Sequence, residues 1–351
     1  MKKNIAIIMG GYSSEYKISL KSGNVVYDTL DSTKYNVYRI HVFKDKWVYV
    51  DEDDIEIPID KNDFSINIDS FKITFDYNND EFPIDKNDFS VTVKQTKITF
   101  DCVFNAIHGS PGEDGYMQAY FKLLDIPQTS CDMYQATLTF NKRDCLSVLK
   151  PYGIKTAESF YINLGDTINE DNIVNKVGLP CFVKANKAGS SFGISKVYKK
   201  EDLQNAIDIA FKEDDEIIIE SYLDGTEVSV GVISYKGQTK VLPITEIVSD
   251  NDFFDYEAKY QGKSKEITPA RLSKEEENKV NKVAKQVYDI LKMKGFSRSE
   301  YIFKNGEPHL LEVNTVPGLT RESILPQQAA CAGISLSMLF DNAIESSLNP
   351  S

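Results

Sequence analysis

The chain has 351 residues and a net charge of −13 at pH 7, with 41% hydrophobic and 26% charged side chains. This length predicts two or three domains, and the composition excludes a wholly disordered chain. The acidic balance argues against a nucleic-acid-binding surface, which needs clustered positive charge. No apolar stretch is long enough to span a membrane, so we expect neither a nucleic acid nor a membrane as a partner.

The N-terminal residues and the cysteines indicate the compartment. The run "MKKNIAIIMGG" is short and ends in Gly-Gly rather than in a small-residue cleavage site, so we expect no signal peptide. Five cysteines are scattered without CxxC spacing. We therefore expect a cytoplasmic protein with mostly structural thiols.

The first elements predict an α/β domain. "NIAIIMGG" indicates a buried strand that ends in a glycine turn, and "SSEYKISLKSGNVVYDTL" indicates a helix after it. The glycines lack GxGxxG spacing, so a dinucleotide-binding fold is not indicated.

A repeat follows. Residues 58–76 recur at 83–101, and each copy alternates apolar and polar residues around a short polar break, which predicts a β-hairpin. The second copy runs directly into "DCVFNAIHGSPGEDG". We therefore expect the second copy in the core position and the first as a surface addition.

The middle of the chain alternates helices and strands. "CVFNAIHG" predicts a strand and "DGYMQAYFKLLDI" a helix, and Pro127 marks a boundary. "TLTFNKRDCLSVLKPYGI" predicts one helix closed by Pro151 and Gly153. "PCFVKANKAGSSFGISKVY" predicts a strand, a glycine-rich loop and a strand, and "KEDLQNAIDIAFKEDD" an amphipathic helix.

The remaining elements include two predicted strand pairs. "EIIIESYLDGTEVSVGVI" predicts two strands about an Asp-Gly turn. A polar stretch at 249–267 precedes the long helix "SKEEENKVNKVAKQVYDILKMKG". "SRSEYIFKNGEPHLLEVN" predicts a hairpin about Asn305 and Gly306, and a C-terminal helix follows it.

Three segments carry residues suited to a nucleotide and a metal ion. In "VKANKAGSSFG" small residues can bring backbone N–H groups close to a phosphate, although many ordinary hairpins also have Gly-Ser loops. The segment is not a Walker A motif, because its lysine precedes the glycines. In "IIIESYLDGTE" two glutamates flank a turn that suits adenine and ribose, or are simply solvated. The predicted C-terminal hairpin brings together an arginine and three oxygen ligands, namely Arg298, Glu300, Glu312 and Asn314.

Glu312 and Asn314 project from the same face of a strand because they are two residues apart. They are hard oxygen ligands of the kind that Mg²⁺ prefers when substrate phosphates supply most of its coordination. The alternative is an exposed ladder of cross-strand ion pairs. The combination with the lysine loop favours a metal-nucleotide site.

At this point the chain resembles the D-alanine:D-alanine ligases of the ATP-grasp superfamily over nearly its whole length. The resemblance is carried by "GGYSSEYKISLKSG", "HGSPGEDGYMQ", "FVKANKAGSSFGISKV", "DYEAKY" and "LLEVNTVPGLT". It implies an α/β (α+β ATP-grasp) fold of three domains: an N-terminal substrate domain at 1–130 with the duplicated hairpin, a central ATP-grasp lid domain at 131–222 and a C-terminal catalytic domain at 223–351. It also implies that ATP is held between the central and C-terminal domains.

The resemblance further implies the reaction, in which ATP phosphorylates one D-alanine and the amine of a second attacks the acylphosphate, for peptidoglycan synthesis. The cofactors it implies are ATP and two Mg²⁺ ions, for which Mn²⁺ can substitute, and the expected assembly is a homodimer. The implied metal ligands are Glu300, Glu312 and Asn314. The implied ATP-binding residues are Lys142, Lys184, Ser191, Glu220, Tyr222, Leu223, Glu227 and Lys259.

The resemblance also assigns residues to the amino acid substrates. Arg298 and the backbone N–H of Gly318 match the donors to the oxyanion. Glu15, Ser190 and Tyr260 match a hydrogen-bonded trio that ties a mobile loop, expected at 249–267, over the site. Glu15 and His108 match the first D-alanine site, and Ser323 and Ile324 match the carboxylate site of the second.

This chain departs from the family pattern at two positions. Arg298-Ser299-Glu300 stands where Arg-x-Asp is usual, so the geometry of the first metal ion does not carry over directly. Ala185 replaces the usual proline. Tyr260 favours an amine nucleophile. The alternatives are a related ligase that uses D-lactate or D-serine and a homologue with impaired catalysis.

Overall fold

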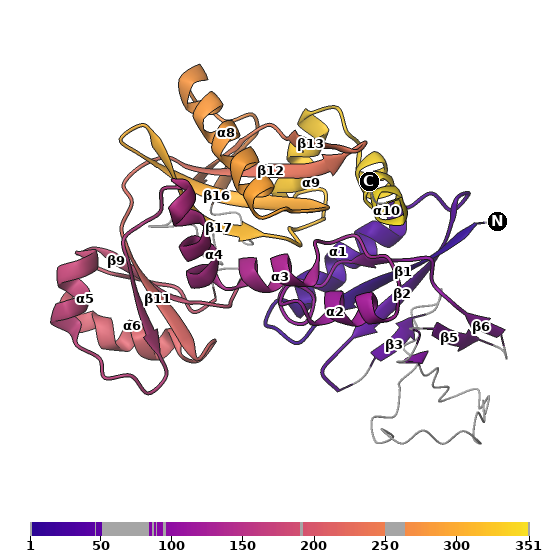
Figure 1. Ribbon diagram of the computed structural model, residues 1–351, viewed down its shortest axis with the longest axis horizontal. Helices are drawn as coiled ribbons and strands as arrows, with labels where there is room; N and C mark the ends of the chain where they lie inside the picture. Colours follow the sequence, from indigo (N-terminus) through magenta and orange to yellow (C-terminus); the bar gives the residue numbers. More distant parts are fainter. Residues whose placement is uncertain are drawn as a thin grey trace.

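The computed structural model describes residues 2–45, 47–50, 84–85, 88, 90–93, 96–189, 192–249 and 264–349. Figure 1 shows an elongated molecule in which the sheet holding β12, β16 and β17 lies between the N-terminal sheet and the sheet holding β9 and β11. Within the described residues, no helix combines the length and apolar character needed to cross a membrane.

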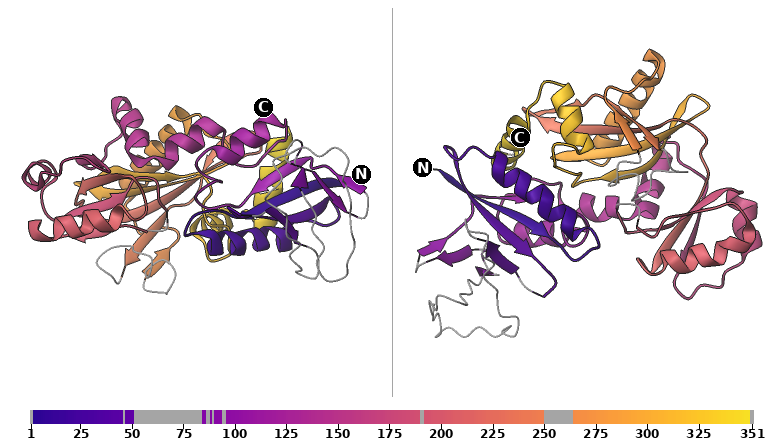
Figure 2. Two further views of the ribbon diagram at one scale, coloured as in Figure 1. Left: turned by 90° about the horizontal axis from the view of Figure 1, so that it is seen from below. Right: turned by 180° about the vertical axis from the view of Figure 1, so that it is seen from behind.

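The N-terminal sheet has a helix on each face. Its strand order is β3-β2-β1-β7, and β1 pairs in parallel with both β2 and β7. Alternate residues of β1 face opposite sides: Ile5 and Ile7 share a core with α1, whereas Ile8 shares one with α2. The indigo helix α1 lies along the N-terminal sheet in the right-hand view of Figure 2. The predicted strand and both helices are confirmed. The bounds are β1 (Lys3–Gly10), α1 (Tyr16–Thr29), β2 (Tyr35–Val42), β3 (Trp47–Val50), β7 (Cys102–Asn105) and α2 (Tyr116–Leu123).

A small sheet of β4 (Ile84–Asp85), β5 (Ser90–Val93) and β6 (Thr96–Ile98) precedes β7. Strands β5 and β6 pair antiparallel, which confirms the hairpin predicted for the second copy of the repeat. The first copy lies outside the described residues.

The prediction of one continuous helix over residues 137–154 is wrong, because two helices meet there. Helix α3 (Met133–Phe140) ends and α4 (Lys142–Leu149) begins at Asn141, whose backbone is extended at φ −88° and ψ 100°. The Asn141 side chain accepts a hydrogen bond from the Asp144 N–H at 3.0 Å. The first N–H groups of a helix have no partner within the helix, so this N-cap supplies one and stabilises the start of α4. A short 3₁₀ turn, η1 (Lys150–Tyr152), ends at Gly153.

The second sheet, which we call the lid sheet, is antiparallel with the order β10-β9-β11-β8. Helices α5 and α6 pack on one face through Val183, Ile217 and Ile219. Lys184 follows Val183, and Glu220 follows Ile219, so both side chains face the side of the sheet opposite to the helices. The bounds are β8 (Ser159–Asn163), α5 (Glu170–Val177), β9 (Cys181–Ala185), β10 (Ser195–Val197), η2 (Lys200–Asp202), α6 (Leu203–Ala210) and β11 (Glu216–Ser221).

The third sheet, the large sheet, has the order β15-β14-β12-β16-β17, with β13 also paired to β12. Helices α8 and α4 share one core with Val228 and Val230 of β12. On the other side, α9 and α10 share a core with both the large and the N-terminal sheets, where the Phe104 and Phe340 rings lie 5.4 Å apart. The bounds are β12 (Glu227–Tyr235), β13 (Gln238–Val241), β14 (Thr245–Ser249), β15 (Ser264–Ile267), α8 (Lys274–Ile290), β16 (Phe296–Lys304), β17 (Glu307–Asn314), α9 (Ile324–Cys331) and α10 (Leu336–Leu348).

Two further predictions in this region need correction. Strands β11 and β12 do not pair about the Asp-Gly turn, because β11 lies between β9 and β8 while β14 and β16 flank β12. The connection passes close to the large sheet instead: a side chain at Gly225 would collide with the Phe303 carbonyl oxygen. The polar stretch at 249–267 is not all loop, since its two ends pair antiparallel as β14 and β15.

Candidate active site

The hairpin of β16 and β17 presents the predicted oxygen ligands side by side. In its register Glu300 lies opposite Glu312 and Arg298 opposite Asn314. The Asn314 side chain donates to Glu312 Oε1 at 3.4 Å, so the two side chains do project the same way. Arg298 pairs with Glu300 at 2.9 Å. A carboxylate pair, an amide and a guanidinium therefore share one surface.

Lys142 connects this hairpin to the glycine loop of the lid sheet. It is the first residue of α4, and its Nζ lies 3.1 Å from Glu312 Oε2. The same ammonium donates to the Ala188 carbonyl oxygen at 2.7 Å. Lys142 thus joins the large sheet and the lid sheet at one point.

Lys184 lies on β9 and projects toward the same region. Its Nζ lies 2.7 Å from Glu220 Oε2, and both side chains are nearly buried. Burial opposes the charge of the ammonium, but Glu220, Glu312 and Glu227 outweigh it and raise the pKa of Lys184. Lys184 therefore keeps its charge at neutral pH.

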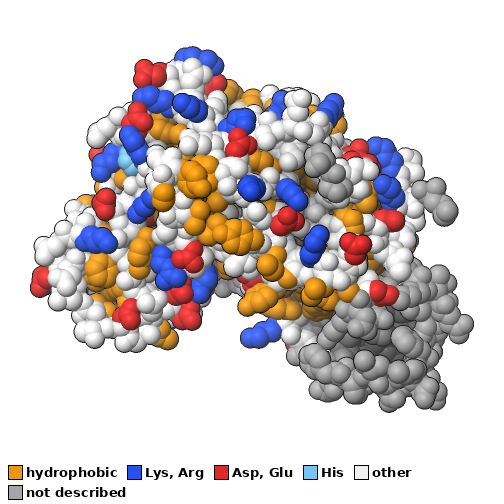
Figure 3. All heavy atoms as spheres, in the orientation of Figure 1, with side chains coloured by type: hydrophobic (Ala, Val, Ile, Leu, Met, Phe, Trp, Pro, Cys, Tyr) orange, Lys and Arg blue, Asp and Glu red, His pale blue; other side chains and the backbone are white. Residues whose placement is uncertain are grey.

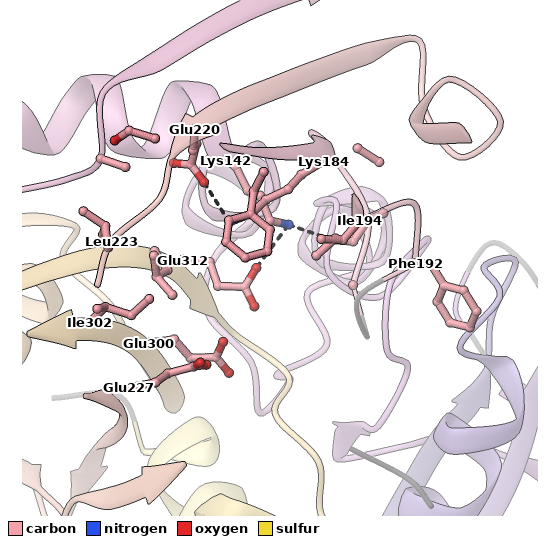
Figure 4. Close-up of a pocket in the computed structure, with 17 residues that line it drawn as sticks. Lys142, Lys184, Phe192, Ile194, Glu220, Leu223, Glu227, Glu300, Ile302 and Glu312 are labelled. Carbon is pink, nitrogen blue, oxygen red and sulfur yellow. Dashed lines mark hydrogen bonds and ion pairs between the residues drawn. The ribbon is translucent and has the colours of Figure 1, made fainter. Parts of the chain in front are cut away.

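A single cavity collects these groups between the two sheets. Its empty space, including the part open to solvent, is about 830 Å³. Figure 4 shows the two lysines and Glu220 on one side, with Glu227, Glu300 and Glu312 on the other. Apolar side chains complete the wall: Phe182, Ile194, Leu223, Ile302 and Leu311. The combination of apolar side chains and concentrated charge suits a nucleotide.

One end of the cavity has a group ready to accept a hydrogen bond. Glu220 Oε1 is buried and has no hydrogen-bond partner among the described residues. Leu223 lines the cavity, and the adjacent Tyr222 ring lies 6.3 Å from that of Phe182. These residues fit a purine ring and its amino group.

A second cavity continues toward the N-terminal sheet. It is lined by Lys142, Gly189, Glu312 and Asn314 together with Glu113. Among the described residues, no group of three or more His, Cys, Asp or Glu side chains is arranged to hold a metal ion alone. Two carboxylates and one amide fit an ion that takes its remaining ligands from phosphate and water.

The predicted first-substrate residues lie where the N-terminal sheet meets the glycine loop. Glu15 is buried, and a methyl group added at Gly189 would fall 2.5 Å from Glu15 Oε2. His108 Nε2 lies 2.8 Å from Ser22 Oγ, and Nδ1 lies 2.7 Å from the Val316 carbonyl oxygen. Burial lowers the pKa of His108, against the pull of Glu15, so the ring is neutral at pH 7.

Glu113 was not named as a site residue from the sequence, although it lies in the quoted segment "HGSPGEDGYMQ". Its two carboxyl oxygens accept from the N–H of Gly109 at 2.8 Å and from that of Val316 at 3.0 Å. Burial, assisted by the nearby Glu15 carboxylate, raises the pKa of Glu113 to about 8. His108 and Glu113 together hold the carbonyl and the N–H of Val316. They therefore fix the loop that carries Gly318.

The predicted second-substrate residues surround the start of α9. A side chain at Gly318 would fall 2.7 Å from Ser323 Oγ, which also lies 2.9 Å from Thr320 Oγ1. Ser323 is the N-cap of α9, and the Ile324 side chain packs against Ile247. The backbone at this helix start therefore has the polarity that suits a carboxylate.

Four predicted site residues lie outside the described residues, namely Ser190, Ser191, Lys259 and Tyr260. Their neighbours Gly189 and Phe192 line the first cavity. The structure therefore does not test the trio of Glu15, Ser190 and Tyr260.

A lid sheet and a large sheet that grip a cavity of lysines and carboxylates define an ATP-grasp ligase. The profile described as D-ala D-ala ligase N-terminus matches residues 4–131, and that described as D-ala D-ala ligase C-terminus matches residues 148–345. The chain belongs to the D-alanine–D-alanine ligase family.

Individual relatives agree with this membership. The chain is 69% identical over 346 residues to the D-alanine–D-alanine ligase of Flavobacterium johnsoniae, with 99% of each chain covered. It is 57% identical over 349 residues to that of Christiangramia forsetii, again with 99% of each covered.

Solved structures share the fold. The D-alanine–D-alanine ligase from Bacillus anthracis complexed with ATP superposes with a TM-score of 0.73 at 28% identity, covering 99% of this chain and 97% of that one. The VanG D-Ala:D-Ser ligase from Enterococcus faecalis superposes with a TM-score of 0.79 at 28% identity, covering 98% and 99%.

Proposed function

We propose that this protein joins two D-alanine molecules into D-alanyl-D-alanine at the expense of ATP, for peptidoglycan synthesis. The observation that carries the proposal is the cavity in which Lys142, Lys184, Glu300 and Glu312 converge from α4, the lid sheet and the large sheet, next to the buried Glu15. Positive charge on one side of the cavity and oxygen ligands on the other are what a transferring phosphoryl group requires.

ATP lies with its adenine against the apolar wall and its phosphates between the lysines. Glu220 accepts from the adenine amino group, Tyr222 and Leu223 border the ring, and Glu227 accepts from the ribose. Lys142 and Lys184 hold the α- and β-phosphates, with Ser191 and Lys259 adding donors toward the phosphates. Support for these roles comes from the cavity lining and from the orphaned oxygen of Glu220.

Glu300, Glu312 and Asn314 would hold two Mg²⁺ ions, for which Mn²⁺ can substitute. When bound, these ions neutralise charge on the phosphoryl oxygens. The Arg298–Glu300 pair at 2.9 Å keeps the longer carboxylate side chain oriented in the place where the family usually has aspartate.

The first step joins a carboxylate oxygen of D-alanine to the γ-phosphorus and releases ADP. Glu15 binds the ammonium of this D-alanine, and neutral His108 lies beside it. The trio of Glu15, Ser190 and Tyr260 ties the connection between β14 and β15 over the site. Its closure excludes water from the acylphosphate.

In the second step the amine of another D-alanine attacks the acyl carbon and loses a proton, and phosphate leaves with the oxygen that bridged carbon and phosphorus. Arg298 and the Gly318 N–H stabilise the oxyanion that forms on the way. Ser323 and the α9 backbone at Ile324 hold the carboxylate of the incoming D-alanine.

The wider setting of the enzyme follows from the same proposal. We expect it in the cytoplasm, divided into domains at 1–130, 131–222 and 223–351, with no nucleic acid or membrane partner. A homodimer is supported by exposed apolar side chains on α2 and α3, namely Tyr116, Leu123, Met133 and Tyr134. Figure 3 shows hydrophobic side chains gathered near the centre of this face of the molecule.

Phosphate release from ATP, compared with D-alanine, L-alanine and D-lactate side by side, tests the function. The proposal predicts rapid release with D-alanine alone, in a one-to-one ratio to dipeptide. Equal release with L-alanine would contradict it. The likeness to a D-Ala:D-Ser ligase adds D-serine as a second nucleophile to be compared, and preference for it over D-alanine would favour that alternative.

A further inference from the structure

A buried polar junction joins the lid sheet to α4 just behind the phosphate lysines. The end of β9, the start of β11 and the start of α4 meet there. Helix α4 packs into the core of the large sheet through Leu146 and Leu149, whereas β9 and β11 belong to the lid sheet. The junction therefore connects the two halves that grip the nucleotide.

Asn186 lies at the centre of this junction and is only 1% exposed. Its Nδ2 donates to Asn141 Oδ1 at 2.8 Å and to Glu216 Oε2 at 2.9 Å. Its Oδ1 accepts from the Arg143 N–H at 2.8 Å. The side-chain amide thus uses both its donors and its acceptor, each with a defined partner.

The backbone of Asn186 adds two further contacts. Its carbonyl oxygen accepts from the Lys142 N–H at 3.3 Å, and its N–H donates to the Glu216 carbonyl oxygen at 3.0 Å. Asn186 also lies two residues after Lys184 and three before Gly189. Asn186 is therefore bonded directly to the backbone of Lys142 and directly follows β9, the strand that carries Lys184.

We propose that Asn186 is a positioning residue that sets the placement of Lys142 relative to Lys184 around the ATP phosphates. The inference rests on the phosphate role proposed above for the two lysines. Without the amide, α4 and β9 keep their own cores and the backbone bond between Asn186 and Lys142. They lose the buried side-chain bonds from Asn186 to Asn141 and to the Arg143 N–H, which orient one against the other. The lysine ammonium groups then no longer meet the phosphates together, and preorganisation is lost.

The chemistry of the amide gives a specific reversal test. Asn186→Asp keeps an acceptor for the Arg143 N–H but sets a carboxylate oxygen against the Glu216 carboxylate, where a donor is required. Glu216→Gln supplies the missing donor from the other side. The double variant should therefore recover part of what Asn186→Asp loses, which a general loss of packing would not do.

The test measures dissociation constants for ATP and for adenosine, with Mg²⁺ and without D-alanine, together with melting temperatures. Asn186→Ala should weaken ATP binding about tenfold or more while adenosine binding changes less than about threefold, because only the phosphate contacts depend on the junction. The matched control is Asn169→Ala, which removes the asparagine N-cap of α5 in the same lid sheet unit, at an exposed position. It should lower the melting temperature without changing the ratio of the two constants.

The outcomes separate the inference from the proposed function. If Asn186→Ala changes ATP and adenosine binding equally, or neither, the positioning role is overturned. If Lys184→Ala also leaves the ratio unchanged, the phosphate role of the lysines fails as well, and with it the inference. Should Asn186→Ala not fold, Asn186→Asp with and without Glu216→Gln decides the question, and absence of any recovery of ATP binding overturns the role.

Discussion

Gly189 leaves no room for a side chain beside Glu15, which makes Gly189→Ala a direct test of the first-substrate site. The added methyl group would fall 2.5 Å from Glu15 Oε2 and 2.7 Å from Oε1. To reach the ordinary contact distance of 3.4 Å, the carboxylate must move by about 0.9 Å. Glu15 is only 7% exposed, so its surroundings limit that movement.

A misplacement of about 1 Å in a substrate-positioning group costs on the order of 10²-fold in rate. We therefore expect kcat/KM for D-alanine to fall by about that factor in Gly189→Ala, with the dissociation constant of ATP nearly unchanged. Initial rates of phosphate release at saturating ATP measure the first quantity. Unchanged kcat/KM for D-alanine would refute the reasoning, because it would mean that the position of Glu15 is not needed.

The same substitution in a Glu15→Ala background shows whether the effect acts through Glu15. Gly189→Ala should then cost little further, since no carboxylate remains to be displaced. A full additional loss would place the defect in the glycine loop itself.

Three other predictions test the remaining groups. Arg298→Ala should lower turnover by roughly 10² or more with ATP binding largely intact, and unchanged turnover would remove Arg298 from the oxyanion site. Glu300→Asp withdraws the carboxylate from Arg298 by one methylene, so the Mg²⁺ concentration for half-maximal rate should rise; an unchanged concentration would show that the longer side chain is not required. Glu113 has its pKa raised from 4.5 to about 8, so its stabilising contribution is complete below about pH 4.5 and is lost as the pH rises through about 8. Glu113→Gln should therefore show a smaller fall in melting temperature between about pH 6 and pH 9 than the parent, and equal falls would contradict the assignment.

Much of the secondary structure could be predicted from the sequence because local rules applied. The apolar run that ends in glycines in "NIAIIMGG" and the Asn305-Gly306 turn each specify their element within a few residues, and the structure has a strand and a hairpin there. The side-by-side projection of Glu312 and Asn314 followed from the period of a strand alone.

Features that depend on distant contacts could not be predicted in this way. The Asp224-Gly225 pair resembles a hairpin turn, but the partners of β11 and β12 are strands remote in sequence, so the chain crosses between sheets instead. The break at Asn141 is likewise supported by Asn186, which is 45 residues away. No local pattern contains that information.

The same distinction applies to the site. The lysines and carboxylates lie in recognisable segments, whereas Glu113 acts by bonding to Gly109 and to Val316, which is 203 residues further along the chain. Its role is visible only when both loops are in place.

The transfer of an oxygen isotope tests the central claim most directly, namely that the cavity between the two sheets moves the γ-phosphoryl group of ATP onto a carboxylate. D-Alanine labelled with oxygen-18 in its carboxylate is turned over with unlabelled ATP, and the released phosphate is analysed by mass. We predict one labelled oxygen in each phosphate at full labelling, because the attacking carboxylate oxygen leaves with phosphorus when the amine attacks. Unlabelled phosphate, or label found in AMP instead, would contradict the claim.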